Sequence, residues 1–388
     1  MNDRVNLIGA DIDSADVIVI GAGVVGGAIA YYLSKMGKSV IILEQDEVAS
    51  GASGGNNGQI SIIDREPGIE LEWANESMKM YRGYEDAGEF KTDLEITGGL
   101  ALFYSDEEIE IGRKVVDKYS ALGYDCSILI GDEIKKQEPN INTEVVMGAA
   151  YCGEEGRLNP FTITIGLIDC GVARGARLYQ KTKVIYFILD GNRVKEVVTE
   201  KGRFRGDTVV VATGAWTREL MSMLGLDYKI FYGRGTLMVT NPIEPCVRGP
   251  IVPGCFAIGT LYEGDWNLLG LTQHKNGTIT IGQDTRGVTN YDKGVSYDGT
   301  IGLAKAFAKH FPTLKDLDIV RVWSAVTPHV EDSLPIYGYS GKYPNMFMAA
   351  GLKGALTIAP AAGLMAAKII MGETDDNLVA DYSPTRFE

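Results

Sequence analysis

A glycine-rich turn between two apolar runs, close to the N-terminus, constrains this chain most strongly. The apolar run VIVI at 17–20 leads directly into GAGVVG at 21–26, a G-x-G-x-x-G turn. A helical stretch at 27–36 and a second apolar run at 39–43 follow, and that run ends on Glu44. Strand, turn, helix, strand and acid in this order predict the β-α-β unit of a dinucleotide-binding fold. The other interpretation of these residues is a glycine-rich turn in an ordinary β-α-β unit.

Each glycine of the turn has a separate task in that fold. Gly21 permits the tight turn, Gly23 lets the backbone approach a pyrophosphate, and Gly26 lets the helix pack closely on the strand. The first backbone N–H groups of the helix and its dipole favour phosphate at this end. Glu44 stands where an acid can bind ribose hydroxyls. The sequence therefore predicts a dinucleotide site on this unit.

The length and charge of the chain limit the classes of protein to which it can belong. Its 388 residues exceed what one hydrophobic core usually supports, so we expect two domains. The formal net charge of −14 argues against nucleic acid and anionic membrane surfaces as partners, because both select basic surfaces. No apolar segment is long enough for a membrane span, and residues 1–16 lack a signal-peptide core. We expect a cytoplasmic protein with no integral membrane segment.

The cysteines and histidines give no spacing that is typical of a metal site. The five cysteines are odd in number and scattered, and no C-x-x-C pair occurs among them. This pattern predicts a reduced protein with no metal site. The three histidines are far apart, and we expect them to be surface or packing residues. The cysteines are Cys126, Cys152, Cys170, Cys246 and Cys255, and the histidines are His274, His310 and His329.

The rest of the chain alternates between helical and strand patterns. A loop of small polar residues occupies 49–59, where it would lie against the cofactor. Asn159 and Pro160 suit the N-cap and the first position of a helix. Hairpins are expected at 190–192 and at 276–277. The expected helices cover 68–90, 106–122, 161–174, 300–310 and 359–371, and the expected strands cover 97–104, 178–184, 208–212, 268–272, 278–282 and 346–350.

Two further strands run into small residues and then into a helix. They are 208–216 and 346–357, and both would approach the ligand at the carboxyl edge of the sheet. The fold class expected is therefore α/β: a Rossmann-like, discontinuous cofactor-binding domain with an inserted, sheet-rich (α+β) substrate domain. The expected cofactor domain comprises 14–89, 151–219 and 321–376, the substrate domain comprises 90–150 and 220–320, and the terminal extensions are 1–13 and 377–388.

Several segments, in their order and spacing, resemble the D-amino acid oxidase superfamily of flavoproteins. The likeness extends to glycine oxidases, D-amino acid dehydrogenases and the β subunits of sarcosine oxidase and proline dehydrogenase, and it covers nearly the whole chain. The segments are GAGVVG with Glu44, ASGGNNGQI (52–60), EGRLNP (155–160), VVVATGAW (209–216), YGRGTLMVT (232–240), RVW (321–323), DSLPIYG (332–338), AAGLKGALTIAPAAG (349–363) and YSPTRF (382–387).

The resemblance implies non-covalently bound FAD. The turn would meet the pyrophosphate, Glu44 the adenosine ribose, the backbone of Val184 the adenine, and 351–357 the pyrimidine edge of the flavin. No metal ligands are expected. The cofactor-binding residues implied are Gly21, Ala22, Gly23, Val24, Val25, Gly26, Glu44, Gln45, Ala52, Ser53, Asn57, Gly58, Gln59, Val184, Ala212, Thr213, Gly214, Trp216, Gly351, Leu352, Lys353, Gly354, Ala355, Leu356 and Thr357.

In this family the reaction is oxidation of a C–N bond. The resemblance implies hydride transfer from a small amino acid or secondary amine to flavin N5, which gives an imine. Alternatives left open are a β-type subunit of a multi-subunit dehydrogenase acting on an opine or a carboxylate-free amine, and a subunit that mainly relays electrons. The β-type alternative implies a partner subunit or an electron carrier. An oligomeric protein is compatible with this alternative and with the main hypothesis.

Three positions depart from the family pattern near the substrate. Thr327 stands where glycine-oxidase-like relatives carry a carboxylate-binding arginine, and Gly270 stands where they carry a tyrosine. Thr280 replaces an oxygen-activating lysine, which favours a dehydrogenase over an oxidase. Another cation must take the anchor role if the substrate has a free carboxylate. The candidates are Arg65, Arg234 and Lys353, and Lys353 and Arg65 are the predicted catalytic residues.

Overall fold

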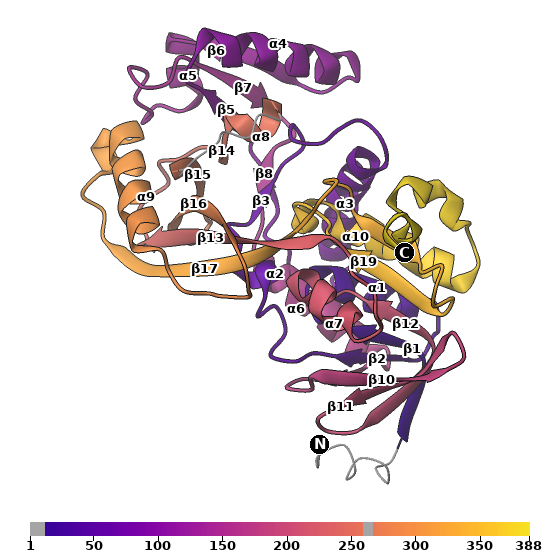
Figure 1. Cartoon of the computed structure of the whole chain (residues 1–388). Coiled ribbons are helices and arrows are strands. Elements are labelled where there is room, and N and C mark those ends of the chain that lie inside the picture. Colours follow the sequence, from indigo (N-terminus) through magenta and orange to yellow (C-terminus); the bar gives the residue numbers. More distant parts are fainter. Residues whose placement is uncertain (1–11, 259–266) are drawn as a thin grey trace.

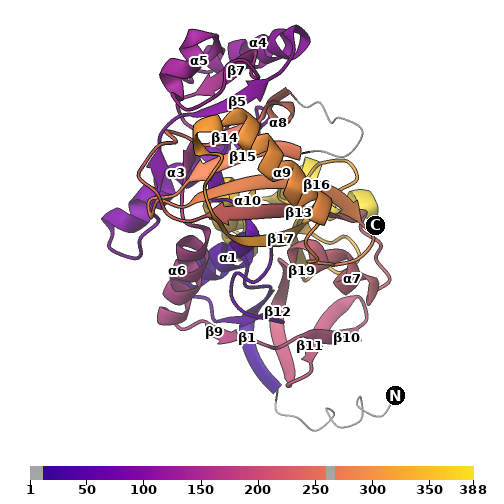
Figure 2. The same cartoon turned by 90° about the vertical axis from the view of Figure 1, so that its left-hand side faces the viewer.

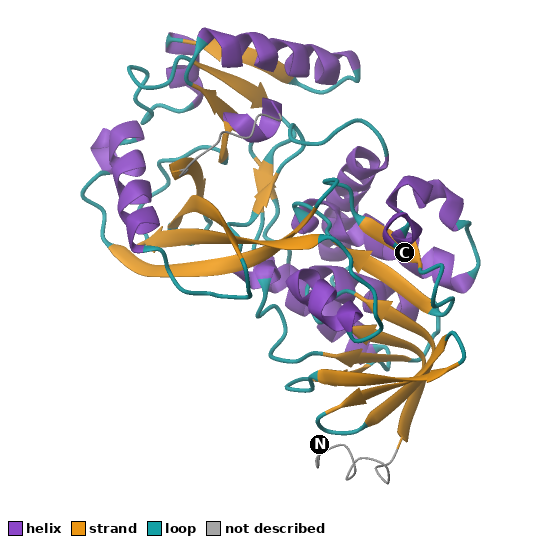
Figure 3. Ribbon diagram, in the orientation of Figure 1, coloured by secondary structure: helices purple, strands orange, loops and turns teal. Residues whose placement is uncertain are grey.

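The computed structural model describes residues 12–258 and 267–388. They form two eight-stranded sheets, with a small three-stranded sheet between them (Figure 1). One buried apolar cluster contains residues of both large sheets. Figure 3 shows that each large sheet carries its own helices. No helix among the described residues has the length and apolar character needed to cross a bilayer.

The first sheet contains the predicted β-α-β unit. Its central strands are parallel, with β1 between β2 and β12, and β19 pairs with β12. Residues 17–20 of β1 are at most 5% exposed, as expected for a strand covered on both faces. The strands are β1 (Ile12–Ile20), β2 (Val40–Leu43), β9 (Arg177–Tyr179), β10 (Val184–Asp190), β11 (Arg193–Thr199), β12 (Arg203–Val211), β18 (Ile336–Tyr339) and β19 (Met346–Ala350).

Helices rich in small residues cover one face of this sheet. α1 contacts α6 and α10, and α10 also contacts α3. Gly363 of α10 lies against Ala28 of α1, where a Cβ would be only 2.5 Å from the Ala28 Cβ, so these helices approach closely. Asn159 caps α6 as predicted, because its side chain accepts hydrogen bonds from the N–H groups of 161 and 162. The helices on this face are α1 (Val24–Lys35), α3 (Ile69–Asp86), α6 (Pro160–Ala173) and α10 (Ala355–Met371). α7 (Thr217–Ser222) packs on the opposite face, in the cluster that contains Ile18 and Ile20.

The second sheet has the strand order β17-β13-β16-β15-β14-β5-β7-β6. Helix α9 packs on β15 and β16, and Figure 2 shows it crossing that face, while α4 packs on β6 and β7. The strands are β5 (Gly99–Phe103), β6 (Cys126–Ile130), β7 (Gly148–Cys152), β13 (Ile230–Thr240), β14 (Ile251–Pro253), β15 (Asn267–Gln273), β16 (Ile279–Val288) and β17 (Ile319–Val330). The helices are α4 (Asp106–Ala121), α5 (Asp132–Gln137), α8 (Gly254–Ile258) and α9 (Tyr297–His310).

The remaining elements are short. The third sheet consists of β3 (Gln59–Ile60), β4 (Glu95–Ile96) and β8 (Gly156–Arg157). A helical turn, α2 (Ala52–Gly55), interrupts the predicted polar loop. 3-10 turns occupy η1 (Gly214–Trp216), η2 (Pro312–Leu314), η3 (Asp376–Tyr382) and η4 (Pro384–Phe387).

Four details of the predicted organisation need correction. The cofactor domain does not resume at 321, because β17 pairs with β13 in the second sheet as far as Val330. The strand expected at 178–184 is two strands, β9 and β10, separated at Lys181, whose φ is 53°. The extension 1–13 lies mostly outside the described residues, and β1 already begins at Ile12. The extension 377–388 folds back on the body, where the Glu388 carboxylate accepts a hydrogen bond from the Tyr228 hydroxyl.

The last helix also differs from its prediction, because it begins at Ala355 rather than 359. Pro360 lies inside it and cannot donate the backbone hydrogen bond that the Leu356 carbonyl would normally accept. The hydroxyl of Tyr81, a fully buried residue of α3, donates to this carbonyl at 2.5 Å instead. A side chain distant in the sequence therefore lets the helix extend through a proline.

Candidate functional site

One large cavity, of about 950 Å³, runs from the carboxyl edge of the first sheet to the second sheet. Its walls come from segments far apart in the chain: the glycine turn after β1, the 49–59 segment, 212–216 after β12, 326–331 at the end of β17, and 349–357 after β19. These strands therefore converge as the sequence predicted, at the edge where open α/β sheets bind ligands.

The glycine turn has the geometry of a phosphate cradle. Gly21 has φ 108°, and a Cβ there would lie 2.5 Å from the Ala212 carbonyl oxygen, so the adjacent strand excludes any side chain. A Cβ on Gly26 would collide with the Gly21 carbonyl oxygen. Helix α1 begins after Gly23 with no side-chain cap and no acidic residue in its first turn. Its N-terminus is therefore suited to an anion.

Glu44 lies at the end of β2, beside this turn. Its Oε2 accepts a hydrogen bond from the Ala22 N–H at 2.9 Å, and its Oε1 accepts one from the Asp46 N–H at 2.8 Å. Burial raises the pKa of this carboxyl above its usual value, although both hydrogen bonds oppose the shift. The acid thus braces the turn and borders the cavity at the predicted ribose position.

The 49–59 segment joins the two halves of the site. The Ser53 hydroxyl accepts a hydrogen bond from the Val24 N–H at 3.0 Å, which fixes α2 against the start of α1. The Gln59 side-chain amide donates to the carbonyls of Ile251 and Leu271, at 2.9 and 3.1 Å, in the second sheet. The loop predicted to lie against the cofactor is therefore a connected wall between the sheets.

The 351–357 segment forms the opposite wall and is held by Arg65. The Arg65 guanidinium donates to the carbonyls of Lys353 and Gly354, at 2.8 and 3.0 Å, and to the Glu70 carboxylate at 3.1 Å. Arg65 is only 5% exposed. This geometry does not favour the predicted role of Arg65 as a substrate anchor, because both terminal nitrogens of its guanidinium already bond to the wall or to Glu70.

Lys353 has a different position from Arg65. Its side chain is 61% exposed, its ammonium lies 3.9 Å from the Asp64 carboxylate, and it also lies over the ring of Phe256. Within the described lining, the arginine and lysine side chains are Arg65, Lys183 and Lys353. Lys183 lies beside Val184 at the predicted adenine end. Arg234, the third candidate anchor, does not line the cavity and pairs with Asp292 at 2.9 Å.

The end of β17 adds two polar side chains that face the cavity. The Thr327 hydroxyl donates to the Gly233 carbonyl at 3.1 Å and lies 3.0 Å from Nε2 of His329. His329 is open to the cavity, yet desolvation by the surrounding protein, and then the charge of Lys353, lower the pKa of its imidazole. Gly270 also lines the cavity, and a Cβ there would lie 2.9 Å from the Gly282 carbonyl oxygen, so β16 crowds any side chain at this position.

Most of the predicted cofactor residues line this cavity. The exceptions are Ala22, Gly26 and Gly58, which act through the backbone packing of the turn and the adjoining wall. The lining residues are Gly21, Gly23, Val24, Val25, Glu44, Gln45, Ala52, Ser53, Asn57, Gln59, Val184, Ala212, Thr213, Gly214, Trp216 and 351–357.

Sequence reasoning missed His329 and Asn56. His329 was expected to be a surface or packing residue, but it stands two positions after Thr327 on one strand, so both side chains point to the same side. That alternation was the signal that could have found it. Asn56 lines the cavity, and its Oδ1 accepts a hydrogen bond from the Gly58 N–H at 2.7 Å, an Asx turn that its place before a glycine indicates.

These features fit FAD. The N-terminus of α1, whose N-cap Gly23 has no side chain, borders the cavity at the pyrophosphate position. An acid lies at the ribose position, and the cavity continues from there to a region between the two sheets. A cofactor with a long dinucleotide shape and a reactive ring at one end would occupy both regions.

Comparisons with known proteins agree with this fit. A family model described as "FAD dependent oxidoreductase" (DAO) matches residues 16–369. The chain is 25% identical over 382 residues to glycine oxidase from Geobacillus kaustophilus (strain HTA426), covering 96% of this chain and 97% of that protein. It is 26% identical over 397 residues to an opine oxidase subunit from Rhizobium meliloti, covering 96% and 98%. The solved structure of L-proline dehydrogenase from P. horikoshii matches with a TM-score of 0.85 and 26% identity, covering 97% and 98%.

Proposed function

This chain belongs to the family of FAD-dependent oxidoreductases, and on that premise we propose that it oxidises a C–N bond in a small amino acid or secondary amine to an imine. The observation that carries the proposal is the continuity of the cavity, from the glycine turn to the region bordered by Thr327, His329 and Lys353. The similarity to a glycine oxidase, an opine oxidase subunit and a proline dehydrogenase supports a C–N substrate.

Each wall of the cavity has a role in this proposal. The turn, the start of α1 and Glu44 would hold the cofactor's pyrophosphate and ribose, and the backbone of 351–357 would border its ring system. Bound FAD supplies the two-electron acceptor for the oxidation. The apolar side chains of Val252, Phe256 and Val326 exclude water from the space beside Thr327. The substrate is thus positioned and desolvated by this chain's own residues.

We assign substrate-carboxylate binding to Lys353. Arg65 is occupied by the wall, and Lys183 lies at the other end of the cavity, so Lys353 is the remaining arginine or lysine among the described lining residues. The lowered pKa of His329 favours a neutral imidazole near pH 7. Its Nε2 and the Thr327 hydroxyl are bonded to each other, and this pair would border a polar group of the substrate.

A second candidate is favoured by Thr327 and by the similarity to an opine oxidase subunit. In it, the chain is a β-type subunit that acts on an opine or a carboxylate-free amine and passes electrons to a partner subunit or carrier. Such a subunit needs no arginine at 327. A subunit that mainly relays electrons would keep FAD but would not be reduced by any amine.

Turnover with matched substrates tests these candidates. The FAD-loaded protein is assayed with an artificial electron-accepting dye and, separately, with oxygen. The substrates are glycine, sarcosine, proline, D-alanine, an opine and the corresponding carboxylate-free amines. The proposal expects turnover of a carboxylate-bearing amine and a faster reaction with the dye than with oxygen. Turnover of the carboxylate-free amines alone would favour the second candidate, and oxidation of 2-hydroxy acids alone would contradict both.

A further inference from the structure

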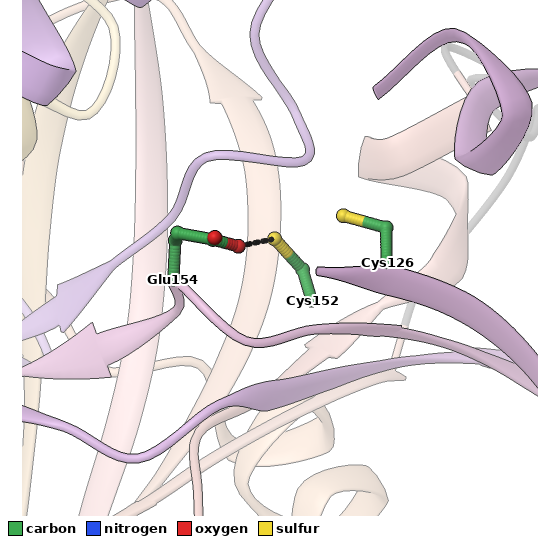
Figure 4. A group of neighbouring side chains, drawn as sticks. All are labelled: Cys126, Cys152 and Glu154. Atoms are coloured by element: carbon green, nitrogen blue, oxygen red, sulfur yellow. Dashed lines mark hydrogen bonds between the residues drawn. The ribbon is translucent and has the colours of Figure 1, made fainter. Parts of the chain in front are cut away.

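A group of three potential metal ligands lies outside the cofactor cavity. It consists of Cys126 at the start of β6, Cys152 at the end of β7, and Glu154 just beyond it (Figure 4). Their ligand atoms all lie within 4.8 Å of one another. The sequence predicted no metal site because it contains no C-x-x-C pair, but this group forms through strand pairing rather than through local spacing.

The register of the two strands brings the cysteine side chains together. Cys126 and Cys152 are directly opposite each other in the antiparallel pair. At the next position, the Gly153 N–H donates to the Asp125 carbonyl at 2.8 Å, so Asp125 and Gly153 form a hydrogen-bonded pair of the two strands. The cysteines therefore occupy a non-hydrogen-bonded pair, in which opposite side chains approach most closely.

Glu154 is held where it can complete the group. Its Oε2 lies 3.5 Å from Sγ of Cys152, and its Oε1 accepts a hydrogen bond from the Asp125 N–H at 3.3 Å. In a tetrahedral zinc site, the usual Zn–S and Zn–O bond lengths place sulfur and oxygen about 3.6 Å apart. The 3.5 Å between Oε2 of Glu154 and Sγ of Cys152 is close to this distance. The hydrogen bond from the Asp125 N–H would orient the Glu154 carboxylate as a ligand, as contacts outside the ligand shell do in metal sites.

The group also has an access route and a connection to the cofactor cavity. Glu154 lines a second cavity, of about 660 Å³, between α3 and the connection from α4 to β6, and this cavity shares no lining residue with the first. Ions and water can therefore reach the partly buried side of the group. The next residue, Glu155, accepts hydrogen bonds from the N–H groups of Ile62 and Ile63 at 2.7 and 2.9 Å, beside the wall of the cofactor cavity.

We propose that Cys126, Cys152 and Glu154 bind one zinc ion, with water in the fourth position. Each cysteine loses its thiol proton to solvent on binding, and two thiolates with one carboxylate match the ligand preference of Zn²⁺. The ion joins β6 to β7 and fixes the corner from which Glu155 holds the cofactor-cavity wall. The site is separate from the FAD chemistry, so its test does not depend on the proposed function.

The test measures metal binding by the FAD-loaded full chain. Reduced protein is freed of metal with a chelator and equilibrated with Zn²⁺ alone, and bound zinc is counted by elemental analysis. X-ray absorption then identifies the atoms around the zinc, and Co²⁺ substitution gives d–d bands at longer wavelengths than oxidised flavin absorbs. We expect about one zinc per chain, with two sulfur neighbours at about 2.3 Å.

Three variants assign the ligands. Cys126→Ser and Glu154→Gln change partly exposed side chains, and retained FAD content checks that they fold. We expect zinc affinity to fall at least about 100-fold in Cys126→Ser and at least about 10-fold in Glu154→Gln, because direct ligands are worth no less than their outer-shell partners. Cys246→Ser, which changes a partly buried cysteine outside the group, should bind zinc unchanged.

Two results would overturn the proposal. The first is a wild-type protein that contains no zinc and shows no Co²⁺ bands, or a Cys126→Ser variant whose zinc content and Co²⁺ bands equal those of the wild type. The other is a Cys126–Cys152 disulfide, found by peptide mass mapping of protein purified without reductant, which would make the pair a redox cross-link.

Discussion

Lys353 is the residue on which the assignment of a carboxylate substrate depends. Lys353→Ala should lower kcat/KM for a carboxylate-bearing amine by about 10- to 100-fold, the loss expected for a charge-assisted hydrogen bond of about 1.5–3 kcal/mol. The effect should appear mainly in KM and should be small for the matching carboxylate-free amine. Lys183→Ala, which removes a cation at the other end of the cavity, is the control and should leave KM for the amine unchanged.

Arg65 should behave as part of the wall. Arg65→Met removes the donors to the carbonyls of Lys353 and Gly354 and leaves Glu70 without its partner, so it should lower the free energy of unfolding by about 3 kcal/mol or more and weaken FAD binding. Denaturant unfolding and FAD titration measure both quantities. Arg82→Met, at an exposed position of α3, should change stability by less than about 0.5 kcal/mol. Unchanged stability with a raised KM would instead return Arg65 to the anchor role.

His274 makes stability depend on pH. Its Nε2 bonds the Thr280 hydroxyl at 2.8 Å, and burial, with a smaller effect from the charge of Arg157, lowers the pKa of the imidazole to about 4. In the unfolded chain the pKa of His274 is about 6.5, so the unfolded state takes up the proton first as the pH falls. The free energy of unfolding is therefore highest above pH 6.5, and it decreases by about 3 kcal/mol as the pH falls towards 4.

His274→Gln should therefore have a flatter pH profile of stability. The difference in unfolding free energy between wild type and variant should shrink between about pH 7 and pH 4, as followed by denaturant unfolding at each pH. A difference that stays constant across that interval would show that folding does not lower the pKa of His274.

At the scale of elements, the start of α10 depends on one hydroxyl. Tyr81→Phe leaves the Leu356 carbonyl buried without a donor and should cost about 1–3 kcal/mol of unfolding free energy. In a Pro360→Ala background, residue 360 has an N–H for that carbonyl, so the same change should cost less than about 1 kcal/mol. Denaturant unfolding of the four proteins gives the coupling. An equal cost in both backgrounds would mean that the hydroxyl does not replace the missing donor.

The sequence predicted well those elements whose signals all lie within one segment of the chain. Residues 17–44 contain the whole β-α-β pattern, and Asn159 with Pro160 marks the start of α6, so neither needs a distant partner. The first turn of α10 could not be predicted in the same way, because the donor that permits it comes from α3. β9 and β10 were merged because the segment LYQKTKV (178–184) contains no glycine, asparagine or proline that would indicate the positive φ at Lys181.

At the scale of the whole molecule, the sequence could not show how the two sheets share one site. Most of β17 falls within 321–376, the last segment of the expected cofactor domain, yet this strand pairs along β13 in the other sheet. The Trp323 indole N–H on this strand donates to the Gly55 carbonyl at 2.9 Å, which ties the second sheet to the cofactor wall. The proposed substrate end of the cavity therefore combines His329, Lys353 and Phe256, which only tertiary packing brings to one cavity.

The most direct test of the central claim is the visible spectrum of the FAD-loaded protein under anaerobic conditions, during titration with single amines and amino acids. Oxidation of a C–N bond predicts that one such substrate bleaches the flavin absorption in proportion to the amount added and that an imine or its hydrolysis product forms in equal amount. An FAD-loaded protein that is bleached by none of them, yet is reduced by dithionite, would contradict the claim.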